Sequence, residues 1–135
     1  MKGESRIIQL PKISDPRGNL SVIEGGKHIP FEIKRIYYLY DVPAEAERGG
    51  HGHRHLQQLI IPLSGAFEIM LDDGLHQRAF CLKRPWEGLY IPPMMWRDIK
   101  NFSSGSVCLV LASECYDEKD YFRDYNDFLN AACGK

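Results

Sequence analysis

Short apolar segments, separated by turn-forming residues, run through most of this chain. They are rich in β-branched and aromatic residues, which favour strands. We expect strands at Ile7–Leu10, Asn19–Glu24, Ile33–Tyr40, His55–Ser64, Ala66–Leu71, Gln77–Leu82, Gly88–Ile91, Arg97–Phe102 and Val107–Ser113. Asp73-Gly74, between two of these segments, is a strong hairpin signal. Many strands at short spacing, with almost no helical periodicity, predict an all-β sandwich or barrel.

One short helix is expected at the C-terminus, from Glu118 to Ala132, with Asp117 as its N-cap. An apolar stripe at i, i+3/i+4 and i+7 spacing is formed by Tyr121, Phe122, Tyr125, Phe128 and Leu129. This stripe is expected to pack against the barrel. Because no internal repeat, linker or low-complexity segment is visible, we expect a single domain over residues 1–135.

Composition and charge exclude several classes of partner. The chain has 135 residues and a net charge of −1, with no long run of either sign, so it has no general attraction for nucleic acid or anionic lipid. A nucleotide would have to be held by local arginines. No apolar stretch approaches the ~18 residues of a membrane span, and no signal peptide is visible at Met1-Lys2-Gly3-Glu4. The four cysteines form no CxxC pair. A cytoplasmic protein with reduced thiols is expected.

The segment Gly49–Gln58 is the most informative in the chain, because it places His51 and His53 two residues apart. In an extended strand such residues point to the same face, roughly 6.5–7 Å apart. Two imidazoles in that arrangement can hold a metal ion or transfer protons from one side of a pocket. The residues around them decide between these possibilities.

The histidine pair, followed by Gly65, resembles the first motif of the cupin superfamily, which implies a double-stranded β-helix, or jelly roll. A later segment, Gly88–Trp96, resembles the second cupin motif. Metal-binding cupins take two histidines and a glutamate from the first motif and a further histidine from the second. In this chain the glutamate position falls on Gln57 or Gln58, and the second-motif histidine falls on Trp96 or Arg97.

Two of the four cupin ligands are therefore missing, and neither indole nor guanidinium ligates a transition metal. His55 leaves a metal site open, because it shares a face with His51 and His53 if the strand runs regularly to residue 57. Three imidazoles in line on one strand, however, give poor tetrahedral geometry. We expect proton transfer and no native metal or other cofactor. Histidines with a merely structural role remain an alternative, and either His53 or His55 is the second inward imidazole.

Several collinear segments together resemble one cupin group, the nucleotide-linked 4-keto-6-deoxyglucose 3,4-ketoisomerases, a WxcM-like family of metal-free sugar-nucleotide cupins. The segments are Asp15–Leu20, Arg35–Tyr38, Arg48–Arg54, Leu71–Gly74, Gly88–Pro93, Met95–Arg97 and Ala112–Tyr121. The resemblance implies an isomerase that moves the ketone of a dTDP-linked keto-deoxysugar from C4 to C3, on a route to 3-amino-6-deoxysugars. It also implies a homodimer with exchanged N-terminal strands.

The expected roles follow from this chemistry. Moving a ketone needs an acid and a base that titrate near neutrality, as histidine does. His51 is expected to be the base, His53 its partner, and Tyr37 a donor to the ligand, since alternation places only one of Tyr37 and Tyr38 inside. The residues expected to bind substrate are Arg17, Arg48, Arg54, Trp96 and Arg97.

Three other functions remain open from the sequence. A nucleotide-sugar 3,5-epimerase shares the cupin architecture and removes a proton next to a ketone, but it leaves the ketone at C4. A non-catalytic sugar-binding cupin would exchange no hydrogen with solvent. A metal-dependent oxygenase or isomerase would require the metal site that the missing ligands argue against.

Overall fold

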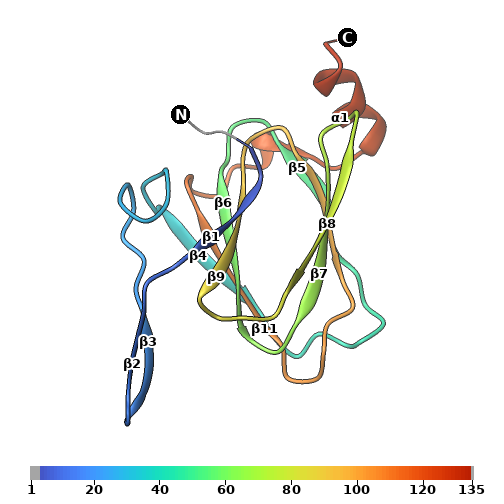
Figure 1. Ribbon diagram of the computed structural model, residues 1–135. Coiled ribbons are helices and arrows are strands. Elements are labelled where there is room, and N and C mark those ends of the chain that lie inside the picture. The colour runs from blue at the N-terminus through green and yellow to red at the C-terminus, as the bar shows by residue number, and fades with distance from the viewer. Residues whose placement is uncertain (1–3, 135) are drawn as a thin grey trace.

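The structure is a computed structural model that describes residues 4–134. Its strands are β1 (Arg6–Gln9), β2 (Lys12–Asp15), β3 (Gly18–Ser21), β4 (Arg35–Leu39), β5 (Arg48–His53), β6 (Gln58–Ser64), β7 (Phe67–Asp72), β8 (Gln77–Leu82), β9 (Glu87–Ile91), β10 (Trp96–Lys100), β11 (Val107–Ala112) and β12 (Tyr121–Phe122). Two five-stranded antiparallel sheets face each other, in the orders β1-β9-β6-β11-β4 and β12-β5-β10-β7-β8 (Figure 1). The all-β jelly roll with a short C-terminal helix is confirmed.

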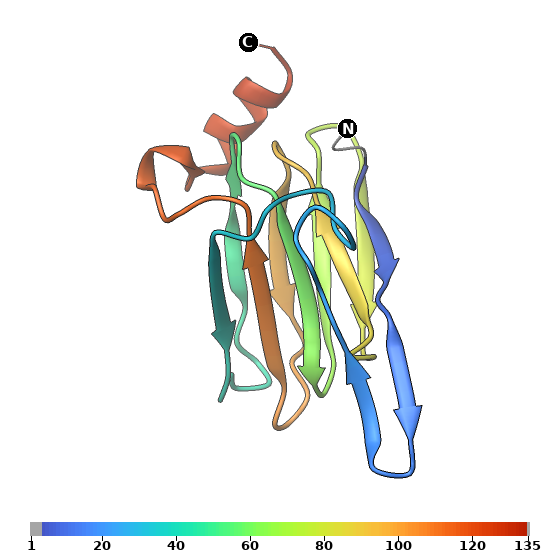
Figure 2. The ribbon, with the colours of Figure 1, turned by 90° about the vertical axis from the view of Figure 1, so that its left-hand side faces the viewer.

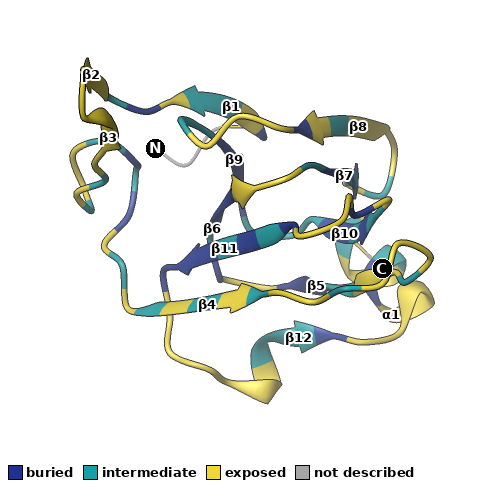
Figure 3. Ribbon diagram, turned by 90° about the horizontal axis from the view of Figure 1, so that it is seen from below, coloured by how far each residue is buried: buried dark blue, intermediate teal, exposed yellow. Residues whose placement is uncertain are grey.

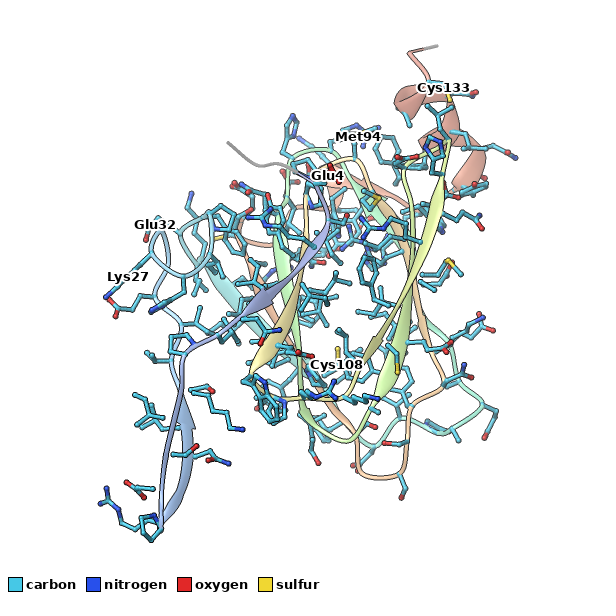
Figure 4. The ribbon with its side chains drawn as sticks, in the orientation of Figure 1. Glu4, Lys27, Glu32, Met94, Cys108 and Cys133 are labelled. Atoms are coloured by element: carbon cyan, nitrogen blue, oxygen red, sulfur yellow. The ribbon has the colours of Figure 1, made fainter. Side chains whose placement is uncertain are left out.

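The space between the sheets is filled by apolar side chains that alternate along the strands with outward-facing residues (Figure 4). The buried members of this inner core are Ile60, Phe67, Ile69, Leu71, Leu82, Leu89, Ile91, Ile99, Phe102, Cys108 and Val110. Burying each large aliphatic side chain contributes roughly 1.5–3 kcal/mol. This core extends from around Cys108, in the lower part of the barrel in Figure 4, up to Leu71 and Ile91, which pair with Arg97 and Gln58.

Strand β6 is buried on both faces, which explains its continuous apolar run. Ile60 points into the inner core, whereas Leu59 and Ile61 belong to a second core on the outer face of the sheet. The loop between β3 and β4 covers that outer face with Ile29 and Phe31. An alternating strand with one solvated face would not need this cover.

The C-terminal segment differs from the single helix expected over 118–132. Residues Glu118–Asp120 form a 3₁₀ turn, η1, for which Asp117 is the N-cap. Residues 121–122 are strand β12, and helix α1 covers only Tyr125–Ala132, with Asp124 as its N-cap. The expected stripe was therefore wrong for its first two aromatics, because β12 pairs with β5. No helix in the described part of the chain has the length and hydropathy needed to cross a membrane.

The β2–β3 hairpin stands apart from the two sheets (Figures 1 and 2). Every residue of both strands is exposed, as the yellow hairpin in Figure 3 shows. These exposed residues include the apolar side chains of Ile13, at 59%, and Leu20, at 57%. The hairpin therefore presents apolar surface that nothing in the described chain covers.

The expected strands mostly match those of the structure, and Gln77–Leu82 matches at both ends. The turn at Asp73-Gly74 joins β7 and β8, and the φ of Gly74 is +100°, which a glycine adopts without strain. Strands β2 and β5 were missed. Strand β5 contains three glycines, which lower its strand propensity, and its pairing with β10 is a tertiary effect.

Candidate active site

Strand β5 carries both histidines into the upper part of the barrel. Alternation turns Gly52 the other way, where a Cβ would lie only 3.2 Å from the Phe128 ring of α1. The ring centroids of His51 and His53 are 4.9 Å apart, in an edge-to-face arrangement. The ring of Tyr121 lies against both, 5.3 Å from His51 and 4.3 Å from His53. The expected pairing of the two imidazoles on one face is present.

The third histidine of the motif is outside the barrel. Strand β5 ends at His53, and the side chain of His55 is 81% exposed. The backbone N–H of His55 donates to Asp120 Oδ1 at 2.8 Å, and its ring Nδ1 lies 3.1 Å from the same oxygen. The second inward imidazole is therefore His53, which is fully buried.

Of the residues expected at the two missing cupin ligand positions, Gln58 and Arg97 are the ones that are buried in the barrel and bind each other. Arg97 is only 1% exposed; its Nη1 donates to Gln58 Oε1, and its Nη2 donates to the Met95 carbonyl at 2.9 Å. Gln58 Nε2 in turn donates to the Tyr37 hydroxyl at 3.1 Å. Gln57 faces elsewhere and accepts from Tyr90 at 2.7 Å. A carboxamide and a guanidinium therefore form a bonded pair inside the barrel.

These surroundings keep both imidazoles neutral. Burial, followed by the positive charge of Arg97, lowers the pKa of His51 to about 4. The same causes hold the pKa of His53 well below its usual range. Burial also lowers the pKa of Arg97, to about 10, so the guanidinium remains a cation at neutral pH. The site therefore combines two unprotonated bases with one fixed positive charge.

A cavity of about 60 Å³ lies beside this group. It is lined by Tyr37, Arg48, His51, Gln58 and Arg97, together with apolar residues of the inner core. Pockets that enclose most of a small ligand typically have volumes of about 300–1,000 Å³. The cavity therefore has room for the reacting part of a substrate, and the rest of the molecule must lie outside it.

Comparisons with known proteins identify the family of this chain. The family model described as FdtA: WxcM-like, C-terminal, matches residues 3–133. This chain belongs to the FdtA family. A TDP-4-oxo-6-deoxy-alpha-D-glucose-3,4-oxoisomerase from Aneurinibacillus thermoaerophilus is 45% identical over 125 residues, which is 93% of this chain and 90% of the relative.

Solved structures of 3,4-ketoisomerases share the fold of this FdtA-family chain. One from Helicobacter canadensis is 45% identical, with a TM-score of 0.93 over 96% of this chain and 97% of the other. QdtA from Thermoanaerobacterium thermosaccharolyticum is 40% identical, with a TM-score of 0.95 over 100% of this chain and 98% of the other. That protein was crystallised as a histidine-to-asparagine mutant in complex with TDP-4-keto-6-deoxyglucose.

Three of the expected substrate-binding residues lie away from the cavity in this FdtA-family chain. Arg17 is at the tip of the β2–β3 hairpin, with its side chain 90% exposed and paired with Asp15 at 2.8 Å. Arg54 donates to two backbone carbonyls of the segment 119–121, at 3.1 and 3.2 Å, and covers the Phe122 ring at 3.9 Å. Arg54 thus holds η1 and β12 in place.

Trp96 is the third of these residues, and it lies on the opposite face of β10 from Arg97. Its ring contacts Tyr125 at 5.3 Å and Phe128 at 5.9 Å, beneath α1. Strand alternation explains the difference, because a residue adjacent to an inward arginine must point outward. Trp96 therefore packs against the helix and does not line the cavity.

Two residues that sequence analysis did not assign to the site lie close to the histidines, and both come from the segment after β11. Asp120 accepts from the backbone N–H of Leu56 at 3.2 Å and lies 3.6 Å from His53 Nδ1. Tyr121 covers both imidazoles, as described above. Both residues were assigned to a helix, and only the pairing of β12 with β5 brings them to the site. Among residues 4–134, no three or more histidine, cysteine or acidic side chains are grouped to hold a metal ion.

Proposed function

We propose that His51 and His53 transfer the protons in the reaction of this chain, which is, like its relatives, a TDP-sugar 3,4-ketoisomerase. The supporting observation is the pair of neutral, adjacent imidazoles, of which His51 lines one small cavity together with Arg97 and Tyr37. Relatives at 40–45% identity act on or bind TDP-4-keto-6-deoxyglucose, and we propose the same substrate here.

The proposed reaction moves the ketone from C4 to C3 without net loss of a proton. His51 removes the proton from C3, and the electrons of that C–H bond form a C3–C4 double bond, which leaves negative charge on the C4 oxygen. The C3 hydroxyl then passes its proton to the C4 oxygen, the C3 carbonyl forms, and the electrons of the double bond bind a proton at C4. This proton is the one that His51 removed from C3, and His53 helps to relay it. Arg97 and Tyr37 stabilise the negative oxygen of the enediolate through charge and hydrogen bonding.

We propose that this reaction needs no metal ion or other cofactor. The Gln58–Arg97 pair supports this, because it fills two ligand positions of metal-binding cupins with groups that ligate poorly or not at all. The buried guanidinium also supplies positive charge at the place where a metal would supply it. Activity in a chelator, and no change on adding zinc, iron or nickel, is the expected result.

We also propose a cytoplasmic homodimer in which the N-terminal strands are exchanged. The β2–β3 hairpin supports this, because it carries Ile13 and Leu20 in exposed positions away from its own barrel (Figure 2). Such an exchange would bring Arg17 to the partner's site, in its expected role of binding substrate. Sedimentation analysis of the wild type and of Leu20→Ser tests the assembly, and a wild-type monomer at micromolar concentration contradicts it.

The decisive test is NMR of the protein with TDP-4-keto-6-deoxyglucose in deuterated buffer. A carbonyl signal that moves from C4 to C3 supports the ketoisomerase, and amination by a C3-specific aminotransferase supports a route to 3-amino sugars. A 3,5-epimerase would instead incorporate deuterium while the ketone stays at C4. A sugar-binding cupin without activity would leave the spectrum unchanged.

A further inference from the structure

The turn between β9 and β10 crosses from one sheet to the other at the upper end of the barrel, where Figure 4 labels Met94. Its residues are Pro92, Pro93, Met94 and Met95. The two prolines have a fixed φ and no N–H, so only the two methionines can donate backbone hydrogen bonds. The turn leads directly into the strand that carries Arg97.

Met94 has a backbone conformation that is unusual for its residue type. Its φ is +61°, in the left-handed region. The other non-glycine residues with positive φ among residues 4–134 are Asp41 and Asn101, whose short polar side chains tolerate this region. A methionine side chain gives no such compensation, so contacts around Met94 must hold it in this conformation.

Two hydrogen bonds connect the turn to the strands of the site. The backbone N–H of Met94 donates to the His53 carbonyl at 2.7 Å. The Met95 carbonyl accepts from Arg97 Nη2 at 2.9 Å. Because each peptide group is planar, the backbone angles of Met94 set the direction in which the chain continues to the Met95 carbonyl. The conformation of Met94 is therefore linked to the position of that acceptor.

The Met95 carbonyl has little room to move. It lies so close to Gly52 of β5 that a Cβ added there would be 3.3 Å from the carbonyl oxygen. The side chain of Met95 packs against the inner core. That of Met94 packs against the aromatic cluster formed by Trp96 with Phe128 of α1 and its neighbours. The turn is therefore held from inside and from outside the barrel.

The guanidinium of Arg97 depends on this carbonyl for its orientation. Its Nη1 donates to Gln58 and its Nη2 to the Met95 carbonyl, whereas Nε has no hydrogen-bond partner among residues 4–134. A guanidinium is planar and its donors form a rigid fork, so these two bonds set the direction of the whole group. The Met95 carbonyl is one of the two acceptors that fix the positive charge beside the cavity.

We infer that Met94 is a positioning residue for the reaction, an inference that rests on the proposed role of Arg97 at the enediolate. The left-handed backbone of Met94 holds the Met95 carbonyl where it orients the Arg97 guanidinium. The Met94 side chain has a separate role, which is to pack against the aromatic cluster under α1. The backbone conformation at residue 94 therefore controls kcat, and its side chain contributes to stability.

Three variants separate the backbone from the side chain. Met94→Gly removes the side chain but adopts a φ of +61° without strain. Met94→Ile keeps an apolar side chain, but a β-branched residue strongly disfavours this conformation. Asn101→Ile is the matched control, because Asn101 has nearly the same φ, +57°, and directly follows the other end of β10.

Steady-state kinetics with TDP-4-keto-6-deoxyglucose and thermal unfolding measure the two effects. Met94→Ile is expected to lower kcat about 10- to 100-fold and to keep KM within about threefold, because a misplaced Arg97 stabilises the enediolate less. Met94→Gly is expected to keep kcat within about threefold and to lower the Tm through lost packing. Asn101→Ile is expected to lower the Tm through backbone strain and to keep kcat within about threefold.

NMR of protein labelled with 15N-arginine gives a readout that does not depend on activity. The side-chain N–H signals of Arg97 are identified by their absence from Arg97→Lys. They are expected to be the same in wild type, Met94→Gly and Asn101→Ile, and shifted or broadened in Met94→Ile, where the bond to the Met95 carbonyl is lost. If Met94→Ile does not fold, Met94→Val, which is also β-branched but smaller, takes its place.

Wild-type kcat or unchanged Arg97 signals in Met94→Ile overturn the inference. An equal loss of kcat in Met94→Gly also overturns it, since that result would assign the effect to the methionine side chain. The same loss in Asn101→Ile overturns it too, because any strain next to β10 would then lower kcat. A wild type that does not move the ketone contradicts the proposed function, and the Arg97 signals still test the position of the guanidinium. An active wild type matched by an equally active Met94→Ile contradicts only the inference.

Discussion

The two ends of the barrel interior are built by the same strands with opposite kinds of side chain. At the lower end Phe67 and Phe102 pack ring against ring, with centroids 5.4 Å apart, inside a wholly apolar core. At the upper end the inward positions hold His53, Gln58 and Arg97, all buried and polar. Successive inward side chains on one strand can differ in this way: on β10, Ile99 is apolar, and Arg97, two residues away on the same face, is charged.

This difference shows how a small barrel separates stability from chemistry. At the lower end apolar side chains pack against one another, and their burial holds the two sheets together. At the upper end several buried polar atoms have no hydrogen-bond partner among residues 4–134, including His51 Nε2 and both ring nitrogens of His53. Such groups reduce stability and are retained where a ligand can use them. Mutations at the two ends should therefore separate activity from stability.

The largest effect is expected at the upper end, from His51→Asn. Asparagine has a similar size but cannot act as a base, so kcat/KM for the TDP-sugar should fall about 10²–10⁴-fold. Because His51 Nε2 has no partner, the Tm should change by only a few degrees. Steady-state kinetics and thermal unfolding measure the two quantities. Retention of activity within tenfold would remove His51 from the proposed mechanism.

Phe67→Ala is expected to produce the converse result at the lower end. The side chain is 1% exposed, and removing it should lower the free energy of unfolding by about 3–5 kcal/mol. The kcat/KM of the protein that stays folded should remain within about threefold, since Phe67 does not line the cavity. Urea unfolding and activity at low temperature measure both. A large loss of kcat/KM with unchanged stability would contradict the separation.

The pH dependence of stability should come mainly from the upper end. His51 has a pKa of about 4 in the folded protein and about 6.5 in the unfolded chain. Between these values the unfolded chain binds a proton that the folded protein does not. Stability is therefore lost as pH falls, by about 1.4 kcal/mol per pH unit for this group, and the loss levels off below pH 4.

Urea unfolding of the wild type and of His51→Asn between pH 7 and pH 4 measures this contribution, which should be absent from the mutant. Turnover should also continue below pH 6 in the wild type, because the base stays unprotonated until about pH 4. An identical pH slope in the two proteins would show that His51 is not held neutral by its surroundings.

The smallest effect is expected from His55, which lies outside the barrel. His55→Ala should change kcat/KM less than threefold and the free energy of unfolding by at most about 0.5 kcal/mol, because the side chain is exposed. Its backbone N–H, which binds Asp120, is unaffected by the substitution. A loss comparable to that of His51→Asn would mean that proton transfer extends beyond the barrel.

Sequence patterns predicted the parts of this molecule that depend on alternation and missed those that depend on long-range pairing. Alternation correctly placed His51 with His53. Trp96 and Arg97 were both expected to bind substrate, but only Arg97 lines the cavity. It also could not show that β5 ends before His55. The bond between Gln58 and Arg97 joins residues 39 positions apart, and no local pattern reports such a contact.

The C-terminal segment shows why the rest of the site was not predictable. Tyr121 has helical spacing relative to Phe128, and Phe122 relative to Leu129, but Tyr121 and Phe122 pair as a strand with β5. The sequence contains two residues suited to an N-cap, Asp117 and Asp124. Helix α1 begins after Asp124, whereas Asp117 caps only the short turn η1.

In the hydrogen-bond chain at the upper end, Arg97 donates to Gln58 and Gln58 donates to Tyr37. This order of donors determines which group the Tyr37 hydroxyl can bind. A phenol carries a single hydrogen, and the oxygen of Tyr37 already receives one from the Gln58 amide. The hydroxyl hydrogen of Tyr37 therefore points away from Gln58 and can be donated to a bound substrate. An incoming oxygen that offers a lone pair, such as that of a carbonyl or an enediolate, can therefore accept this hydrogen.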